Sequence, residues 1–184
     1  VNAQHENPEL PPGHPLGERV VATHDMAQAV SGSSVIFVAV PSTSFRSVVQ
    51  RIMEHAVPGV ILVSTTKGIE AGSFMLMSEV LKAEAPEAKI GVLSGPNLAK
   101  EIAASQLTGT VVASSQESVR ARIQELLKSE TFRVYTNDDV LGIELGGSLK
   151  NIYAIIAGIA SSLGMGHNTN SMLITRSLTE MARF

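Results

Sequence analysis

The 184-residue sequence contains no cysteine, which excludes disulfide bonds, thiolate metal sites and cysteine nucleophiles. Charged side chains make up only 17%, and the net charge of −3 offers no dense basic face for a phosphate backbone, so no nucleic-acid partner is expected. The five histidines lack the spacing of metal ligands, so no metal site is expected. The 44% hydrophobic content is that of a globular protein with a core.

Long hydrophobic runs and a signal peptide are also missing. The longest apolar stretch, residues 152–163, contains a tyrosine, a glycine and two serines. It is shorter than the roughly 20 apolar residues that a membrane span needs. The polar, proline-rich N-terminus does not resemble a secretory signal. We therefore expect no membrane partner and a cytoplasmic location, with which the lack of cysteine is compatible.

The glycine-rich turn that cradles a dinucleotide is absent as well. The sequence contains no G-x-G-x-x-G motif and no Walker-type loop, and Gly164-Met165-Gly166 follows no strand pattern. Two interpretations stay open: a protein that binds no nucleotide, or a chain that lacks a first βαβ unit. The start at Val1, not at methionine, hints at a fragment or a processed product.

What the sequence does contain is an alternation of β-branched apolar runs with segments of helical periodicity. The runs predict strands at 19–23, 34–40, 59–65, 89–94, 110–113 and 132–136. The helical segments are 24–30, 44–55, 74–83, 97–104 and 117–128. This alternation predicts an α/β fold, a partial Rossmann-like doubly wound sheet that is largely parallel and lacks its first βαβ unit.

After Asn137 the alternation stops. Residues 138–184 show two long helical segments, separated near 164–166, and no strand pattern. We therefore expect two domains. Residues 1–137 would form a partial dinucleotide-binding domain, and residues 138–184 would begin an all-helical substrate domain.

Three loops that follow predicted strands carry residues suited to binding an anion. They are Val40-Pro41-Ser42, Thr66-Lys67-Gly68 and Ser94-Gly95-Pro96-Asn97. Ligands of open α/β sheets collect at the carboxyl ends of the strands, and free N–H groups at a helix start bind anions. Each loop also has a purely structural interpretation: a strand stop, a solvated lysine or a capped turn.

A fourth segment, 144–154, places Lys150 and Asn151 in a helix otherwise rich in apolar and small residues. Gly146 and Gly147 each cost about 1 kcal/mol relative to alanine inside a helix, which suggests that a backbone or a ligand comes close. Desolvation among such neighbours lowers the pKa of a lysine and suits it to proton transfer. The alternative is that Lys150 extends to the surface from a tight helix crossing.

Taken together and in order, these segments resemble bacterial-type NAD(P)-dependent glycerol-3-phosphate dehydrogenases. The similar blocks are 7–13, 40–45, 66–68, 94–101, 132–139, 144–151 and 173–181. A single block is a weak signal, whereas their shared order and spacing are specific. The resemblance implies the substrates dihydroxyacetone phosphate and sn-glycerol 3-phosphate, NAD or NADP as cofactor, supply of glycerophospholipid precursors and a homodimer when complete.

The resemblance also implies residue roles. Lys150 would donate and accept the proton at the substrate C2 oxygen, with Asn151 supporting the substrate beside it. Lys67 would contact both substrate and cofactor. The residues implied to bind substrate are Lys67, Gly95, Asn97, Lys150 and Asn151, and those implied to bind cofactor are Phe45, Lys67 and Ala99.

Two features of that family are not found in the sequence: the glycine-rich fingerprint and a later helical region with an Arg-Asn pair. We therefore expect this chain alone to bind dinucleotide poorly, to have little activity, and to expose apolar surface that drives self-association. Two other interpretations stay open. One is another two-domain dehydrogenase with a catalytic Lys-Asn helix, of the 6-phosphogluconate or hydroxyacid type. The other is an inactive fragment that persists as a structural or interaction module.

Overall fold

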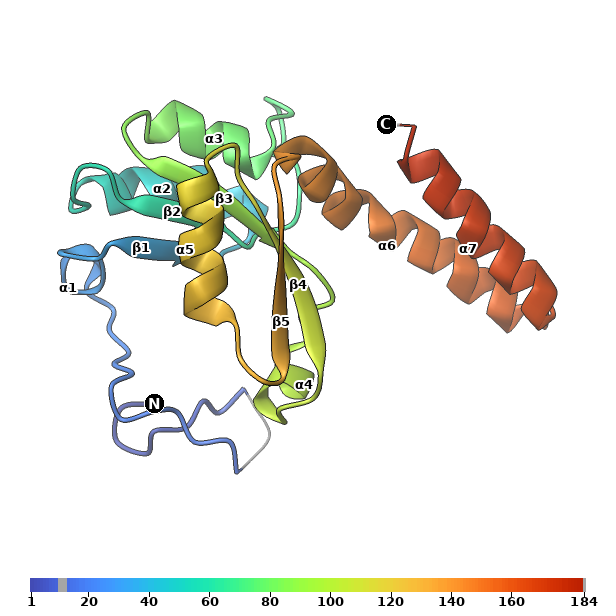
Figure 1. Cartoon of the computed structure of the whole chain (residues 1–184), viewed down its shortest axis with the longest axis horizontal. Coiled ribbons are helices and arrows are strands. Elements are labelled where there is room, and N and C mark those ends of the chain that lie inside the picture. Colours follow the sequence, from blue (N-terminus) through green and yellow to red (C-terminus); the bar gives the residue numbers. More distant parts are fainter. Residues whose placement is uncertain (10–12, 184) are drawn as a thin grey trace.

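The computed structural model describes residues 1–9 and 13–183, so part of the 7–13 block and Phe184 lie outside the described residues. The elements in chain order are α1 (Met26–Val30), β1 (Val35–Val38), α2 (Ser42–Met53), β2 (Ile61–Ser64), α3 (Met77–Glu84), β3 (Lys89–Ser94), α4 (Ala99–Ala103), β4 (Thr108–Ala113), α5 (Glu117–Leu127), β5 (Phe132–Asn137), α6 (Val140–Ser162) and α7 (His167–Met181). Figure 1 shows a sheet with its helices, from which the paired helices α6 and α7 extend.

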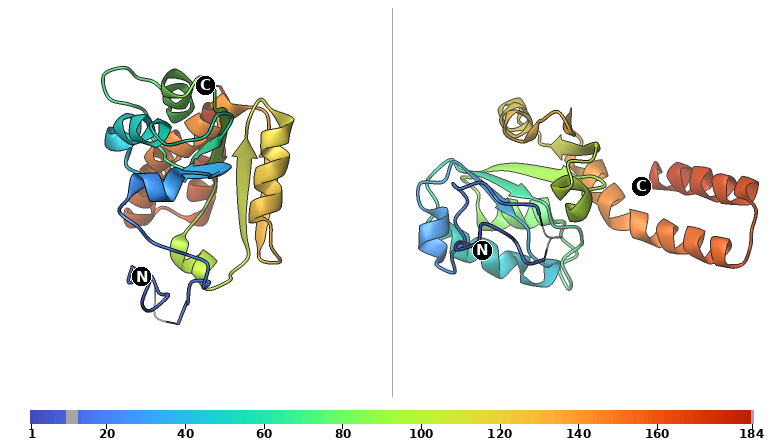
Figure 2. Two further views of the ribbon diagram at one scale, coloured as in Figure 1. Left: turned by 90° about the vertical axis from the view of Figure 1, so that its left-hand side faces the viewer. Right: turned by 90° about the horizontal axis from the view of Figure 1, so that it is seen from below.

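The five strands form one sheet in the order β1-β2-β3-β4-β5. Pairs β1–β2, β2–β3 and β4–β5 are parallel, and β3–β4 is antiparallel. The predicted Rossmann-like, largely parallel α/β sheet is thus confirmed. Because β-α-β crossovers are right-handed, the reversal at β4 places α5 on the face opposite α2 and α3, as Figure 2 shows.

Two apolar cores lie on the two faces of the sheet. Phe45 of α2, Leu81 of α3 and Leu62 of β2 belong to the first core. Val63 of β2 and Ile123 of α5 belong to the second. Neighbouring residues of β2 point to opposite faces and both are fully buried, which explains why the strand has a continuous apolar run. Full burial of each such side chain stabilises the fold by about 1.5–3 kcal/mol.

The strand predicted at 19–23 is wrong, because this stretch is irregular in the structure. Val20 and Val21 are 46% and 67% exposed. A strand forms only where a neighbour accepts and donates its backbone hydrogen bonds, and none of the strands described above pairs with this stretch. The apolar pattern alone therefore does not produce a strand.

The helix predicted at 74–83 begins later, at Met77. Phe74 has a φ angle of 59°, in the left-handed region, which a residue inside a right-handed helix cannot adopt. The helix predicted at 97–104 is likewise confined to Ala99–Ala103, so Pro96 lies before it. The other predicted strands and helices form, with ends shifted by a few residues.

Helix α6 is longer than the apolar stretch suggested, because its 23 residues begin directly after Asp139. By length and composition alone it could cross a membrane, contrary to the expectation from residues 152–163. Its first half packs on β3 and β4. The predicted break is present: Gly164 adopts a φ angle of 72° in the turn that leads to α7.

Candidate active site at the carboxyl ends of β2 and β3

The three segments singled out around Lys67, Gly95 and Lys150 meet in space. Lys67 follows β2, Gly95 follows β3, and α6 crosses the end of β3. Gly95 and Lys150 line an open pocket of about 380 Å³. Its lining residues are Ser94, Gly95, Pro96, Val111, Gly142, Ile143, Gly146, Gly147 and Lys150. Lys67 lines a small adjoining cavity of about 10 Å³, which shares Ser94 and Gly147 with that pocket.

Lys67 and Lys150 place two amino groups near each other. The Lys67 amino group donates a hydrogen bond to the carbonyl oxygen of Gly95 at 3.1 Å. Partial burial lowers the pKa of Lys67, and the neighbouring positive charge of Lys150 lowers it further. An ammonium group has three N–H donors, so Lys67 keeps two for a ligand. An anion bound between the two lysines would relieve their repulsion.

Gly95 fits against β4 because it has no side chain. A Cβ at this position would lie 3.0 Å from the carbonyl oxygen of Gly109 and 3.0 Å from Cα of Thr110. The Asn97 amide donates to the Thr110 hydroxyl at 3.1 Å, which donates in turn to the Ser94 carbonyl oxygen at 3.1 Å. The Asn97 side-chain oxygen is buried and has no partner within the described part of the chain. Because this oxygen is buried and Asn97 does not line the pocket, its contact with a substrate stays a prediction.

Helix α6 lies close to the end of β3 at Gly147. A Cβ on Gly147 would come 2.7 Å from the Ser94 hydroxyl oxygen, whereas a Cβ on Gly146 would meet nothing within 4 Å. A close approach to this glycine pair is therefore found at Gly147, but the neighbouring group is the Ser94 side chain and not the backbone or ligand that was expected. Lys150 follows one turn later at the pocket, and Asn151 is exposed beside it on the same helix.

Phe45 and Ala99 do not join this pocket. Phe45 is fully buried in the core beneath α2, and its ring has no exposed surface for a dinucleotide. Ala99 lines a different pocket, of about 490 Å³, between α4 and the N-terminal segment around His14. Their contacts with a dinucleotide stay predictions. Of the three residues implied to bind cofactor, only Lys67 lies beside Lys150. Its two free N–H donors fit an anionic ligand.

Glu144 also belongs to this region, although no role was predicted for it. Its carboxylate accepts hydrogen bonds from the Ser78 backbone N–H, at 3.0 Å, and from the Ser78 hydroxyl. Burial raises the pKa of Glu144, although the bonds from Ser78 oppose this. The signal available in the sequence was an acidic residue in an otherwise apolar helix segment. The partner could not be found in this way, because it lies 66 residues earlier in the chain.

A cluster of ionic side chains holds the loop that carries Lys67. The Arg46 guanidinium on α2 donates to Glu70 at 2.7 and 2.9 Å and also to Glu84 of α3. The hydrogen bonds from Arg46 and Ser73 lower the pKa of Glu70 to about 2. This cluster ties Glu70, three residues after Lys67, to both helices. Within residues 1–9 and 13–183, no group of three or more acidic or histidine side chains could hold a metal ion.

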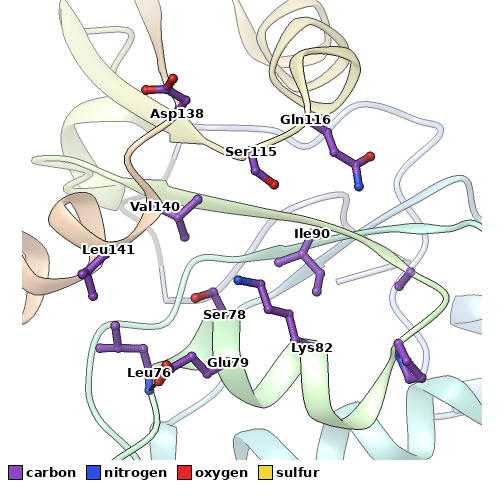
Figure 3. Close-up of a pocket in the computed structure, with 12 residues that line it drawn as sticks. Leu76, Ser78, Glu79, Lys82, Ile90, Ser115, Gln116, Asp138, Val140 and Leu141 are labelled. Atoms are coloured by element: carbon purple, nitrogen blue, oxygen red, sulfur yellow. Dashed lines mark hydrogen bonds between the residues drawn. The ribbon is translucent and has the colours of Figure 1, made fainter.

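A larger pocket of about 560 Å³ lies at the other end of β3 (Figure 3). It is lined by residues from α3, from the start of α5 and from the segment leading into α6, including Lys82, Gln116 and Asp138. None of the residues predicted to bind substrate or cofactor lines it. Chemistry, not size, therefore selects the pocket beside Lys67 and Lys150 as the candidate active site.

A Rossmann-like sheet whose carboxyl edge is crossed by a lysine-bearing helix is compatible with the class of nicotinamide-dependent dehydrogenases, because ligands of such sheets bind at that edge. Family comparison makes the class specific. Residues 1–120 match the N-terminus, and residues 139–184 the C-terminus, of NAD-dependent glycerol-3-phosphate dehydrogenase. The chain belongs to this family, which decides against the 6-phosphogluconate and hydroxyacid types.

Similar proteins cover nearly the whole chain. A glycerol-3-phosphate dehydrogenase (NAD(P)+) of Saccharophagus degradans is 52% identical over 99% of this chain and 51% of its own length. The protein of the same name from Pseudomonas entomophila is 54% identical over 100% of this chain and 54% of its own. The crystal structure of the Coxiella burnetii glycerol-3-phosphate dehydrogenase superposes with a TM-score of 0.89 at 38% identity, covering 99% and 56% of the two chains. The chain thus spans about half the length of the curated relatives it matches.

Proposed function

We propose that the protein is an oxidoreductase that interconverts dihydroxyacetone phosphate and sn-glycerol 3-phosphate with NAD or NADP. The observation that carries the proposal is that two neighbouring lysines meet at Gly95: Lys67 donates to its carbonyl oxygen, and Lys150 lines the pocket beside it. Two cations suit a small phosphorylated ketone, because one can attract the phosphate while the other serves the reacting oxygen. Family membership supports the same substrates.

The residues of this chain act on the oxygen side of the reaction. When bound, NAD(P)H supplies the hydride that adds to the C2 carbonyl carbon. The Lys150 ammonium group donates a proton to the C2 oxygen as negative charge develops on it, and takes the proton back in the reverse direction. Lys67, positioned by its bond to Gly95, stabilises the same charge and holds the ligand. Asn97 and Asn151 supply hydrogen bonds to the substrate hydroxyl groups.

The setting follows from the same family. We propose a cytoplasmic enzyme that supplies sn-glycerol 3-phosphate for glycerophospholipid synthesis and is a homodimer when complete. The bacterial relatives named glycerol-3-phosphate dehydrogenase support the supply of sn-glycerol 3-phosphate. The lack of cysteine is compatible with a reducing compartment.

The test measures oxidation of NADH and NADPH with dihydroxyacetone phosphate for wild type, Lys150→Met, Lys67→Met and Lys128→Met. Because this chain alone is expected to have little activity, each protein is prepared both as this chain and extended to the full length of its relatives. Lys128 is an exposed lysine at the end of α5 and serves as the matched control. We expect Lys150→Met to lose about 100-fold or more of the activity, since general acid–base catalysis contributes factors of that order, and Lys128→Met to lose none. Wild-type turnover in Lys150→Met would refute the assigned role.

A binding measurement tests the site without turnover. Titration with sn-glycerol 3-phosphate, followed by NMR chemical shifts, should perturb residues around Gly95, and glycerol should not. Replacing either lysine of the pair should weaken this binding, whereas Lys128→Met should leave it unchanged. Equal affinities in all three variants would place the phosphate elsewhere.

A further inference from the structure

Glu144 stands out among the buried residues because it is charged. Of the side chains in residues 1–9 and 13–183, it is the only ionisable one that is buried, with 7% of its surface exposed. Its two hydrogen bonds both come from Ser78, the second residue of α3. The first N–H groups of a helix lack partners inside the helix and carry its positive end. Glu144 therefore supplies to α3 a capping group that comes from α6.

This attachment is directional, unlike the apolar contacts around it. Burying a carboxylate costs desolvation free energy, and an apolar side chain of similar size would often stabilise a helix–helix contact as well or better. The free energy of apolar contact, however, depends on the buried area and not on direction, so it constrains the relative position of two helices less than a hydrogen bond does. A carboxylate held by both an N–H and a hydroxyl fixes the helix that carries it in one position. The start of α3, with Ser78 facing the start of α6, is visible in Figure 3.

The position of α6 decides where Lys150 lies. Glu144 and Lys150 are six residues apart on one continuous helix, about 9 Å along its axis at about 1.5 Å per residue. Between them, Gly147 packs on Ser94 at the end of β3. A slip of α6 by one residue would move Lys150 by about 1.5 Å relative to Lys67. A displacement of about 1 Å in a catalytic group can cost on the order of 100-fold in rate.

We propose that Glu144 is a positioning residue for the lysine pair. Its attachment to the start of α3 sets where α6 crosses β3, and so sets the separation of the Lys67 and Lys150 amino groups. The inference rests on the proposed function only for the chemical role given to Lys150. The positioning itself concerns the folded chain and can be tested without turnover.

The test is the yield of a Lys67–Lys150 cross-link, formed with a short amine-reactive bifunctional reagent and quantified by mass spectrometry on the intact chain. We compare wild type, Glu144→Ala, Glu144→Gln and Glu79→Ala. Glu79 is the matched control, since it accepts from the Leu76 backbone N–H at 2.8 Å at the same helix start. It belongs to α3 itself, so its loss leaves the Glu144–Ser78 attachment in place.

We expect a several-fold lower yield for Glu144→Ala, near wild-type yield for Glu79→Ala, and recovery in Glu144→Gln, whose amide oxygen still accepts from Ser78. Wild-type yield in folded Glu144→Ala would overturn the proposal, and so would an equal loss in Glu79→Ala. If Glu144→Ala fails to fold by circular dichroism, Ser78→Ala replaces it. This variant removes the hydroxyl donor and keeps the backbone N–H, so we expect a partial loss of yield, and unchanged yield overturns the proposal. Failure of the proposed function would instead appear as no binding of sn-glycerol 3-phosphate near Gly95 with the cross-link intact.

Discussion

At the scale of single residues, the two adjacent glycines of α6 offer a matched pair. Gly146→Ala meets open space and should stabilise the chain by about 0.5–1 kcal/mol through the better helix propensity of alanine. Gly147→Ala should be less stable than Gly146→Ala by about 1 kcal/mol, because its methyl group must displace the Ser94 hydroxyl. Urea unfolding measures both changes. Equal free energies of unfolding would mean that α6 does not press on β3.

The raised pKa of Glu144 makes a second prediction, about stability and pH. A carboxyl group with a raised pKa in the fold favours folding most below its ordinary value of 4.5, and this contribution is lost as pH rises through the folded value. The glutamine in Glu144→Gln cannot ionise. The melting temperature of this variant should therefore rise relative to that of wild type as pH rises from 4.5 towards neutrality. Thermal melts across that range measure the difference. A constant gap between the two proteins contradicts it.

The residues that the sequence could predict are those whose segments carry their own signal. Lys67, Gly95 and Lys150 each follow or lie within a recognisable segment, and the sheet edge brings them together. Phe45 lies in the core and away from this pocket, so its predicted contact with a cofactor stays a prediction. Glu144 shows the limit, because its partner Ser78 is set by how two helices cross, and no local pattern records that crossing.

At the scale of elements, the start of α6 depends on one cap. The Asp139 carboxylate accepts from the Gly142 backbone N–H at 2.8 Å, whereas Asp138 is exposed and outside the helix. Asp139→Ala should cost about 1 kcal/mol of unfolding free energy, as loss of a helix N-cap does, and Asp138→Ala should cost much less. Asp139→Asn should restore most of the loss. Chemical denaturation that ranks Asp138→Ala as the more harmful change would contradict this assignment.

Most elements could be predicted because a strand covered on both faces has an unbroken apolar run, as β2 does with Leu62 and Val63. The stretch 19–23 has such a run but no neighbouring strand in the described sheet, so it stays irregular. Phe74 shows a different limit. Its left-handed backbone delays the start of α3, and helical periodicity carries no information about such a local conformation.

At the scale of the whole molecule, helices cover both faces of the sheet because one strand, β4, runs in the opposite direction to β3. The sequence predicts alternation and therefore parallel pairs, but the direction of β4 depends on the short link through α4. Once β4 is reversed, right-handed connection places α5 on the second face. The site then lies where β2 and β3 end and α6 crosses β3. Its chemistry thus depends on contacts between segments that are distant in sequence.

The pair formed by α6 and α7 makes the last prediction, about association. It extends from the sheet (Figure 1) and exposes large apolar side chains, among them Ile155 at 64%, Ile159 at 56% and Met172 at 71%. An apolar surface of this kind promotes self-association, and salts such as sulfate strengthen that association. Light scattering should therefore show a mass above that of the monomer, increasing with ammonium sulfate.

Variants locate the contact. Ile155→Lys combined with Ile159→Lys should lower the measured mass, because it places charge on the apolar face of α6. Val21→Lys is the matched control, since Val21 is 67% exposed in the irregular N-terminal stretch, away from both helices. If Val21→Lys reduced association equally, the effect would come from the added charge in general and not from a contact through α6. A monodisperse wild-type monomer would contradict the prediction. It would mean that the exposed apolar surface of α6 and α7 does not bind a second copy of the chain.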